Sequence, residues 1–304
     1  AWANALPNEL VYARPVLGVA YAWALLNQGD IEAGEARLRD AESWVNPVAD
    51  HALPVETMVV ADWEQFQNLP ASIVTARCYV AQARGDIPSS IKYGRLALDL
   101  LPADDYLRRG PAAALLGLAH WASGQLEEAY LALAKAKVEF QLVGSVSFAL
   151  SITYGLADIR IAQGRLGDAI AIYEESLQLA LAQGEPILRG TADLYLGLGA
   201  IYLEQGKLDA AGQYLQQSMT LGEQAALQDW PYRVRVTQAR FKESQGDLEG
   251  AHKLLNEAER LYFRTPVPNV HPVQALRARL WIRQGSLHRV ERWVRDLSLS
   301  VDDD

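Results

Sequence analysis

A short phrase centred on glycine recurs seven times along this 304-residue chain. Three of the copies read "AQGRLGDA", "EQGKLDAA" and "SQGDLEGA". The seven glycines are Gly29, Gly85, Gly124, Gly164, Gly206, Gly246 and Gly285, at successive intervals of 56, 39, 40, 42, 40 and 39 residues. A repeat of this length is typical of a solenoid, in which each unit packs on its neighbours, and not of a compact enzyme fold.

Apolar residues at helical spacing lie on both sides of each glycine. In the copy at Gly206 they are Leu194, Leu198, Ile201 and Tyr202 before the glycine and Leu208, Ala211, Leu215 and Met219 after it. Glycine adopts a left-handed conformation without a Cβ clash, so it suits the end of the first helix. Each copy therefore predicts a helical hairpin.

A small residue follows five positions after almost every glycine, which would let the two helices approach closely. These residues are Gly34, Ser90, Ala129, Ala169, Ala211 and Ala251, with Val290 as the exception. Because one hairpin cannot bury its apolar face alone, the hairpins must stack. We predict an all-α fold, an α-solenoid of about seven hairpins in a right-handed superhelix, as a single domain over residues 1–304.

The first interval carries an insertion at about residues 44–69. Pro47 and Pro54 break the helical pattern there, while Trp63 and Phe66 predict another short helix or a packed loop. We expect an elongated hairpin that covers the end of the core. A functional insertion is the alternative.

Composition and charge exclude several classes of protein. Half of the residues are apolar, which predicts a substantial core, and the single Cys78 excludes a disulfide framework. No stretch is long and apolar enough to span a membrane. The net charge of −9 argues against direct nucleic-acid binding. Residues 233–295 differ, with 13 Lys and Arg against six Asp and Glu, a balance that suits an acidic partner or ligand.

In stacked hairpins the first helix of each pair lines the concave groove, and counting back from each glycine gives the residues that face it. In the amino-terminal part these are the aromatic residues Tyr79, Trp121 and Tyr154, whose flat faces could pack against sugar rings or apolar ligands. The alternative interpretation is that these rings fill the core.

The same count places charged residues in the carboxyl-terminal part of the groove. Arg233, Arg240, Arg279 and Arg283 form a predicted guanidinium cluster suited to carboxylate or phosphate. Asp158 and Asp193 are candidate acceptors for ligand hydroxyl groups. The alternative is a solvated face on which Glu243 and Glu249 balance the arginines.

The sequence predicts neither a metal site nor a catalytic site. The five histidines lie apart, at spacings that would not gather two on one helix face, and His120 is expected in the core beside Trp121. We find no phosphate-binding loop and no nucleophile motif such as GxSxG. An enzyme is therefore not expected.

One repeat resembles the tetratricopeptide pattern. Leu198-Gly199-x-x-Tyr202, followed by Gly206, Leu208 and Ala211, carries this resemblance, and Leu101-Pro102 matches the proline that often closes such a repeat. The other copies keep the glycine, the leucine or isoleucine and the small residue, but their period is about six residues longer than that of a standard repeat.

Nearly the whole chain is similar to the repeat region of MalT-like, LuxR-class ATP-dependent transcriptional activators. The opening "AWANALPNELVYARPVLGVAYAWALLNQGDIEAGEARLRDAES", the stretch "LPADDYLRRGPAAALLGLAHWASGQLEEA" and the terminal "LSLSVDDD" carry this resemblance. In that family an NTPase domain precedes the repeats and a helix-turn-helix domain follows them. The resemblance implies a fragment of a longer cytoplasmic protein, with ATP expected only in the NTPase domain.

Two functions follow from these observations. The first is an effector-sensing region that binds a small-molecule inducer in the groove and relays its presence to the NTPase and DNA-binding domains of the parent chain. The second is an adaptor that holds a peptide or protein partner, for which an acidic tail would suit the arginines. Self-association is compatible with both.

Overall fold

The structure is a computed structural model that describes residues 7–45, 58–262 and 264–296. These residues form helices joined by turns, and none of them lies in a strand. Two compact units can be distinguished. Unit 1 comprises residues 1–159 with the segment Arg264–Pro268, and unit 2 comprises residues 160–263 and 269–304. The all-α repeat architecture predicted from the sequence is confirmed, whereas the single domain stays a prediction.

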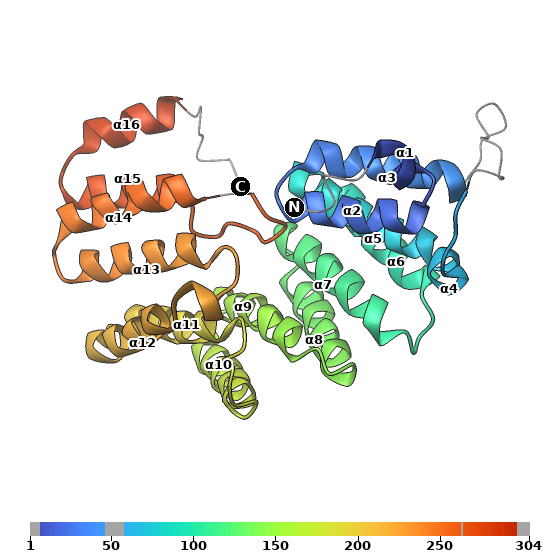
Figure 1. The fold of residues 1–304 in the computed structure, drawn as a ribbon. Coiled ribbons are helices and arrows are strands. Elements are labelled where there is room, and N and C mark those ends of the chain that lie inside the picture. The colour runs from blue at the N-terminus through green and yellow to red at the C-terminus, as the bar shows by residue number, and fades with distance from the viewer. Residues whose placement is uncertain (1–6, 46–57, 263, 297–304) are drawn as a thin grey trace. The chain divides into compact units, whose positions relative to one another are not determined.

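Unit 1 is built from helical hairpins stacked side by side (Figure 1). Its helices are α1 (Asn8–Tyr12), α2 (Pro15–Leu26), α3 (Ile31–Val45), α4 (Trp63–Gln67), α5 (Leu69–Arg84), α6 (Ile87–Leu100), α7 (Tyr106–Ala122), α8 (Leu126–Leu142) and the larger part of α9 (Val146–Ala162). The hairpins are α2 with α3, α5 with α6, and α7 with α8. We call the helix before each repeated glycine the first helix, and the one after it the second helix.

Unit 2 repeats this arrangement. It contains α10 (Leu166–Leu181), α11 (Thr191–Glu204), α12 (Leu208–Leu221), the short 3-10 helix η3 (Gly222–Ala225), α13 (Trp230–Ser244), α14 (Leu248–Leu261), α15 (Val273–Arg283) and α16 (Leu287–Asp296). Here α11 pairs with α12, α13 with α14, and α15 with α16. The division between the units falls inside α9, so the turn at Gly164 joins α9 to α10 along the chain.

All seven repeated glycines adopt the left-handed conformation that the sequence predicts. Their φ angles lie between +70° and +84°. In three copies the residue after the glycine is an aspartate whose side chain caps the second helix, a role that the sequence reading missed. Asp86 accepts from Ser89 N at 3.1 Å, Asp247 from Gly250 N at 2.8 Å and Asp30 from Ala33 N at 3.1 Å. One short phrase thus ends one helix and begins the next.

The small residues five positions after the glycines are buried where the two helices meet. Ala129, Ala169 and Ala251 have no exposed surface, whereas the exception Val290 is half-buried. Cys78 and His120 are buried as well, at 0% and 4% exposure, and His120 Nδ1 lies 2.5 Å from Gln125 Oε1. The predicted core positions of both residues are confirmed.

The insertion at about residues 44–69 contains the short helix α4, as one of the two sequence alternatives predicts. The rings of Trp63 and Phe66 meet edge to face there, with centroids 5.6 Å apart, while 63% of Trp63 stays exposed. Residues 46–57, which include Pro47 and Pro54, lie outside the described part of the chain, as do the aspartates at 302–304. The role of the insertion stays a prediction.

Close helix packing in unit 2 depends on Gly197 of α11. A Cβ added at this position would lie 2.1 Å from Cζ of Tyr173, which is 1% exposed on α10. We expect Gly197→Ala to lower the free energy of unfolding by about 1–3 kcal/mol, because overpacking forces buried groups apart. Urea denaturation followed by circular dichroism measures the change.

Gly167 of α10 offers the matched control, since a Cβ there would meet nothing within 4 Å. Gly167→Ala should leave stability unchanged or raise it slightly, because alanine favours helix. Equal effects of the two substitutions would contradict the packing argument.

Candidate functional site

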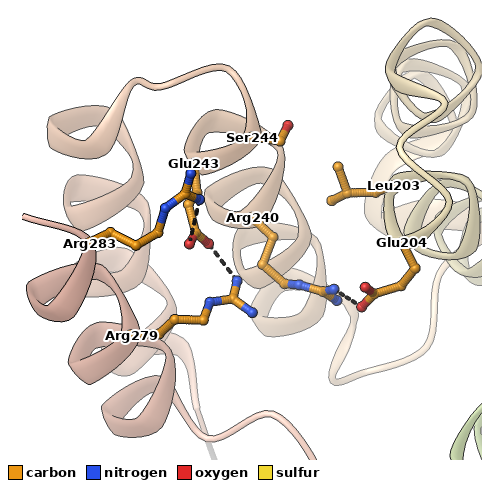
Figure 2. A pocket seen from close by; sticks show the side chains of 7 residues that line it. All are labelled: Leu203, Glu204, Arg240, Glu243, Ser244, Arg279 and Arg283. Atoms are coloured by element: carbon orange, nitrogen blue, oxygen red, sulfur yellow. Dashed lines mark hydrogen bonds and ion pairs between the residues drawn. The ribbon is translucent and has the colours of Figure 1, made fainter.

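A hollow of about 300 Å³ opens on the first-helix face of unit 2 (Figure 2). We call it the arginine hollow. It is lined by Leu203, Glu204, Arg240, Glu243, Ser244, Arg279 and Arg283. These residues come from α11, α13 and α15, the first helices of three consecutive repeats. Arg240 and Arg279, which the count from each glycine places on the groove face, and Arg283 all line this hollow, while their role in binding a ligand stays a prediction.

Glu243 is the buried centre of the arginine hollow. It is 5% exposed, and its carboxylate accepts hydrogen bonds from two arginines that lie one turn apart on α15. Arg283 Nη1 donates to Oε1 at 3.0 Å, and Arg279 Nη2 donates to Oε2. Burial alone would raise the pKa of Glu243, but the two guanidinium groups outweigh it and hold the pKa below its ordinary value.

The third arginine of the hollow is held from the opposite side. Arg240 forms an ion pair with Glu204 through Nη2, and its side chain is 10% exposed. Three guanidinium groups therefore face two carboxylates, which leaves one positive charge in excess. A guanidinium carries five N–H donors, so each arginine keeps donors beyond those used in these pairs. The hollow can accept a carboxylate or a phosphate group.

The arrangement has features of both interpretations of the arginines, the anion-binding cluster and the charge-balanced face. Glu243 balances Arg279 and Arg283, as the solvated-face alternative proposes, but it does so from a buried position. Glu249 lies elsewhere and pairs with Lys253 at 2.8 Å. The side chains of Arg279 and Arg283 are 48% and 52% exposed, so both remain accessible to a ligand.

Arg233 and Asp193 lie outside the lining of the arginine hollow and form a buried pair with each other. Asp193 is 3% exposed, accepts a hydrogen bond from Leu227 N at 2.8 Å and bonds Arg233, which also reaches Asp229. Burial raises the pKa of Asp193, while Arg233 and the Leu227 amide act against this rise. The pair joins α11 to α13, and a ligand role for either residue stays a prediction.

Unit 1 carries a second hollow of about 360 Å³ on its first-helix face, which we call the apolar hollow. It is lined by Trp23, Asn27, Ala71, Ser72, Thr75, Leu101, Leu107, Arg108, Pro111 and Phe148. Leu107 of α7 and Phe148 of α9 are 63% and 62% exposed, which is unusual for side chains of this size. The hollow suits an apolar group, with the Arg108 guanidinium beside it.

The three predicted aromatic residues lie in unit 1, but none of them is among the described residues that line the apolar hollow. The Tyr79 hydroxyl donates to the Leu26 carbonyl at 3.2 Å, and its ring meets that of Trp23 edge to face. Trp121 is 6% exposed and packs against Tyr154, with ring centroids 6.2 Å apart. These positions favour the core-filling alternative. Ligand contact by these rings stays a prediction.

Asp158 is half-buried on α9 and is likewise absent from the described lining of both hollows. The sequence analysis missed Leu107 and Phe148, which lie 17 and 16 residues before their glycines, beyond the positions counted. An apolar residue in the first turn of a first helix was the available signal.

The helical hairpins, their glycine turns and the two hollows on first helices define a tetratricopeptide-type repeat domain. Residues 15–40 match the tetratricopeptide repeat family, and residues 71–304 match the family described as the MalT-like TPR region. Because the second match covers most of the sequence, the chain belongs to the MalT-like TPR region family.

Solved structures of other repeat proteins are similar to this one. The aspartyl phosphate phosphatase F of Bacillus subtilis has a TM-score of 0.66 and 15% identity, over 93% of this chain and 68% of that chain. A Rap protein complexed with competence and sporulation factor has a TM-score of 0.62 and 14% identity, over 96% and 75%. The Rap conjugation gene regulator of plasmid pLS20, in complex with the Phr* peptide, has a TM-score of 0.54 and 13% identity, over 82% of this chain and 75% of that chain. Identities this low show the fold alone.

No curated protein matches the sequence significantly. Among the described residues, no helix has the length and apolar character needed to cross a membrane. The described part of the chain also contains no group of three or more His, Cys, Asp or Glu side chains placed to hold a metal ion.

The charge of Glu243 should make stability depend on pH. Because folding lowers its pKa, the carboxylate stabilises the fold above the pKa of the unfolded chain, and this contribution is lost as the pH falls through the folded-state pKa. At about pH 7 we expect Glu243→Gln to cost about 1–2 kcal/mol, since its half-exposed partners limit the gain. At about pH 3 the two proteins should differ little. Urea denaturation at both pH values measures this.

Glu249→Gln is the control, because Glu249 forms an exposed ion pair with Lys253. It should not change the urea midpoint measurably at either pH. A cost of Glu243→Gln that is the same at both pH values would show that Glu243 acts through packing and not through its charge.

Proposed function

We propose that this chain is the effector-sensing region of a MalT-like, LuxR-class transcriptional regulator in the bacterial cytoplasm. The arginine hollow would bind a small inducer that carries a carboxylate or phosphate group. Membership of the MalT-like TPR region family supports the regulator, and one observation supports the inducer class. A buried carboxylate fixes Arg279 and Arg283, so their remaining donors are already oriented for an anion.

The position of the arginine hollow suits a sensor. Its arginines come from α13 and α15, and Arg240 is also tied to α11 through Glu204. A ligand that bonds Arg240 and Arg279 together would hold neighbouring repeats in one arrangement. Such a ligand shifts an equilibrium between two curvatures by the difference in its affinity for them.

In this proposal the repeat region itself is not catalytic. The inducer-favoured arrangement would act on an NTPase domain and a helix-turn-helix domain of the parent chain, and ATP would bind the NTPase domain only. Self-association of the repeats is compatible with this relay. The reading frame of the parent gene tests the domain arrangement, which requires a phosphate loop upstream and a helix-turn-helix downstream.

Removal of an arginine from the hollow should weaken inducer binding strongly. A panel of metabolites with carboxylate or phosphate groups is first screened by thermal shift and then titrated by calorimetry. We expect Arg240→Ala and Arg279→Ala each to weaken binding by about a hundredfold, because each removes charge-assisted hydrogen bonds. The affinity should also fall with added salt.

Arg277→Ala is the matched control on the same helix. Arg277 bonds Glu259 and Asn256 of α14, away from the lining of the arginine hollow. Inducer affinity should be unchanged in this variant. A ligand that binds all three variants as tightly as the wild type would place the inducer elsewhere, and a screen without any ligand would reject the sensor.

A peptide or protein adaptor is the second candidate, and the apolar hollow of unit 1 favours it. An open hollow with two exposed apolar side chains suits a peptide side chain better than a small polar metabolite. Two of the structurally similar Rap proteins were solved in complex with a peptide or factor.

Peptides selected from a displayed library should depend on Leu107. We expect Leu107→Asp to weaken their binding by at least about tenfold, because it places a charge where the peptide buries apolar surface. Leu131→Asp is the control, since Leu131 of α8 is 62% exposed and lies outside the described lining of the apolar hollow. Equal losses in the two variants, measured by fluorescence anisotropy, would contradict the adaptor site.

A further inference from the structure

Gln82 is a buried polar residue on the first-helix face of unit 1. It lies on α5, three residues before Gly85, and is 5% exposed. The corresponding positions of the neighbouring repeats in this unit hold Leu26 and Trp121. A buried amide in a place that otherwise takes apolar side chains needs hydrogen-bond partners for both of its ends.

One end of the Gln82 amide is held by the second helix of its own hairpin. The Ser90 hydroxyl, which has no exposed surface, lies 3.4 Å from Gln82 Oε1 and also donates to the Cys78 carbonyl at 3.1 Å. The hydroxyl has a single hydrogen and shares it with the closer Cys78 carbonyl, so its bond to Gln82 Oε1 is weak. The orientation of the amide is instead set by the partner of its NH₂ group.

That partner is a backbone carbonyl of a segment distant in the sequence. Gln82 Nε2 donates to the Pro266 carbonyl at 2.8 Å, and Pro266 is buried. The segment Arg264–Pro268 belongs to unit 1, although it follows α14 along the chain. A second contact lies close by, because Arg264 Nη2 is 3.0 Å from the position that a Cβ of Gly85 would occupy.

The segment has the chemistry of an irregular peptide ligand. Thr265 and Val267 each precede a proline, which disfavours helix, and the chain bends at Pro266 and Val267. Pro266 and Pro268 have no N–H, so a receptor can recognise their backbone only through a carbonyl. A carbonyl can only accept hydrogen bonds, and the NH₂ group of an oriented glutamine is a suitable donor.

We propose that the Gln82 amide is a receptor for a backbone carbonyl of a non-helical, proline-containing peptide, and that Arg264–Pro268 is the chain's own occupant of this site. A free peptide of the same kind must displace the segment to bind. The inference does not depend on the inducer proposed for the arginine hollow.

Limited trypsin digestion of the full chain tests the contact. Trypsin cleaves after Arg264, and the rate at the Arg264–Thr265 bond, followed by mass spectrometry, reports how often the segment leaves its site. We expect Gln82→Met, which keeps the shape but removes the donor, to accelerate this cleavage by about tenfold, since one buried hydrogen bond is lost. Gln183→Met, at an exposed position, is the control and should leave the rate unchanged.

A rate at this bond that is the same in wild type and Gln82→Met would overturn the proposal. So would an equal acceleration at the other cleavage sites, because that indicates general unfolding. The proposal keeps a second test if Gln82→Met does not fold.

In this second test residues 264–268 of the chain are replaced by Gly-Ser-Gly-Ser-Gly, and a fluorescein-labelled peptide of sequence RTPVPN is added. The peptide should bind the replaced chain at least about tenfold more tightly than the wild type, in which the tethered segment competes at high effective concentration. Adding Gln82→Leu, which introduces the residue type that Leu26 has at the corresponding position, to the replaced chain should remove the binding. Failure of the peptide to bind the replaced chain, or equal binding to both chains, would overturn the receptor.

Discussion

The close contact between the two helices of each hairpin is the constraint on which the rest of the structure depends. A left-handed glycine ends the first helix, and a small buried residue five positions later lets the second helix return against it. Where aspartate follows the glycine, its side chain also caps the second helix. These local features repeat, so within each unit they place the same positions of the first helices on the same face.

The position three residues before each repeated glycine differs in polarity between the copies. Three residues before the glycine, five copies have an apolar residue, namely Leu26, Trp121, Ile161, Leu203 and Ile282. The other two copies have Gln82 and Glu243, and each of these is 5% exposed with its polar group bonded. A buried polar group costs free energy unless it is satisfied, and at both exceptions the chain supplies the partners from another helix or segment.

The repeat pattern predicted the fold almost completely, because hairpins are specified by residues close in sequence. The glycine conformation, the small buried positions and the core location of Cys78 and His120 agree with the structure. Pairings between distant residues did not follow. Arg240 pairs with Glu204 of another helix, and Gln82 donates to the carbonyl of Pro266 in a distant loop. Such contacts form only when separate helices and loops pack.

The aromatic residues show the limit of a count along one helix. Trp121 occupies a groove position by that count, yet it is 6% exposed because its neighbour Tyr154 packs over it. Leu107 and Phe148, outside the count, are exposed in the apolar hollow. Which face of a ring meets solvent depends on the offset between stacked first helices, and a period of repeats does not specify this offset.

The two carboxylates of the arginine hollow limit the positive charge and the hydrogen-bond donors that an anion would meet there. Glu243 and Glu204 already use some guanidinium donors, so a ligand does not meet three unpaired cations, and the excess is a single charge. A simple anion gains little from that excess in an open, screened site. A group with several acceptors in fixed geometry gains more, because the two carboxylates hold the arginines in place and reduce the entropy lost on binding. In the proposed sensor, the hollow would therefore select by the arrangement of acceptors on the ligand more than by its total charge.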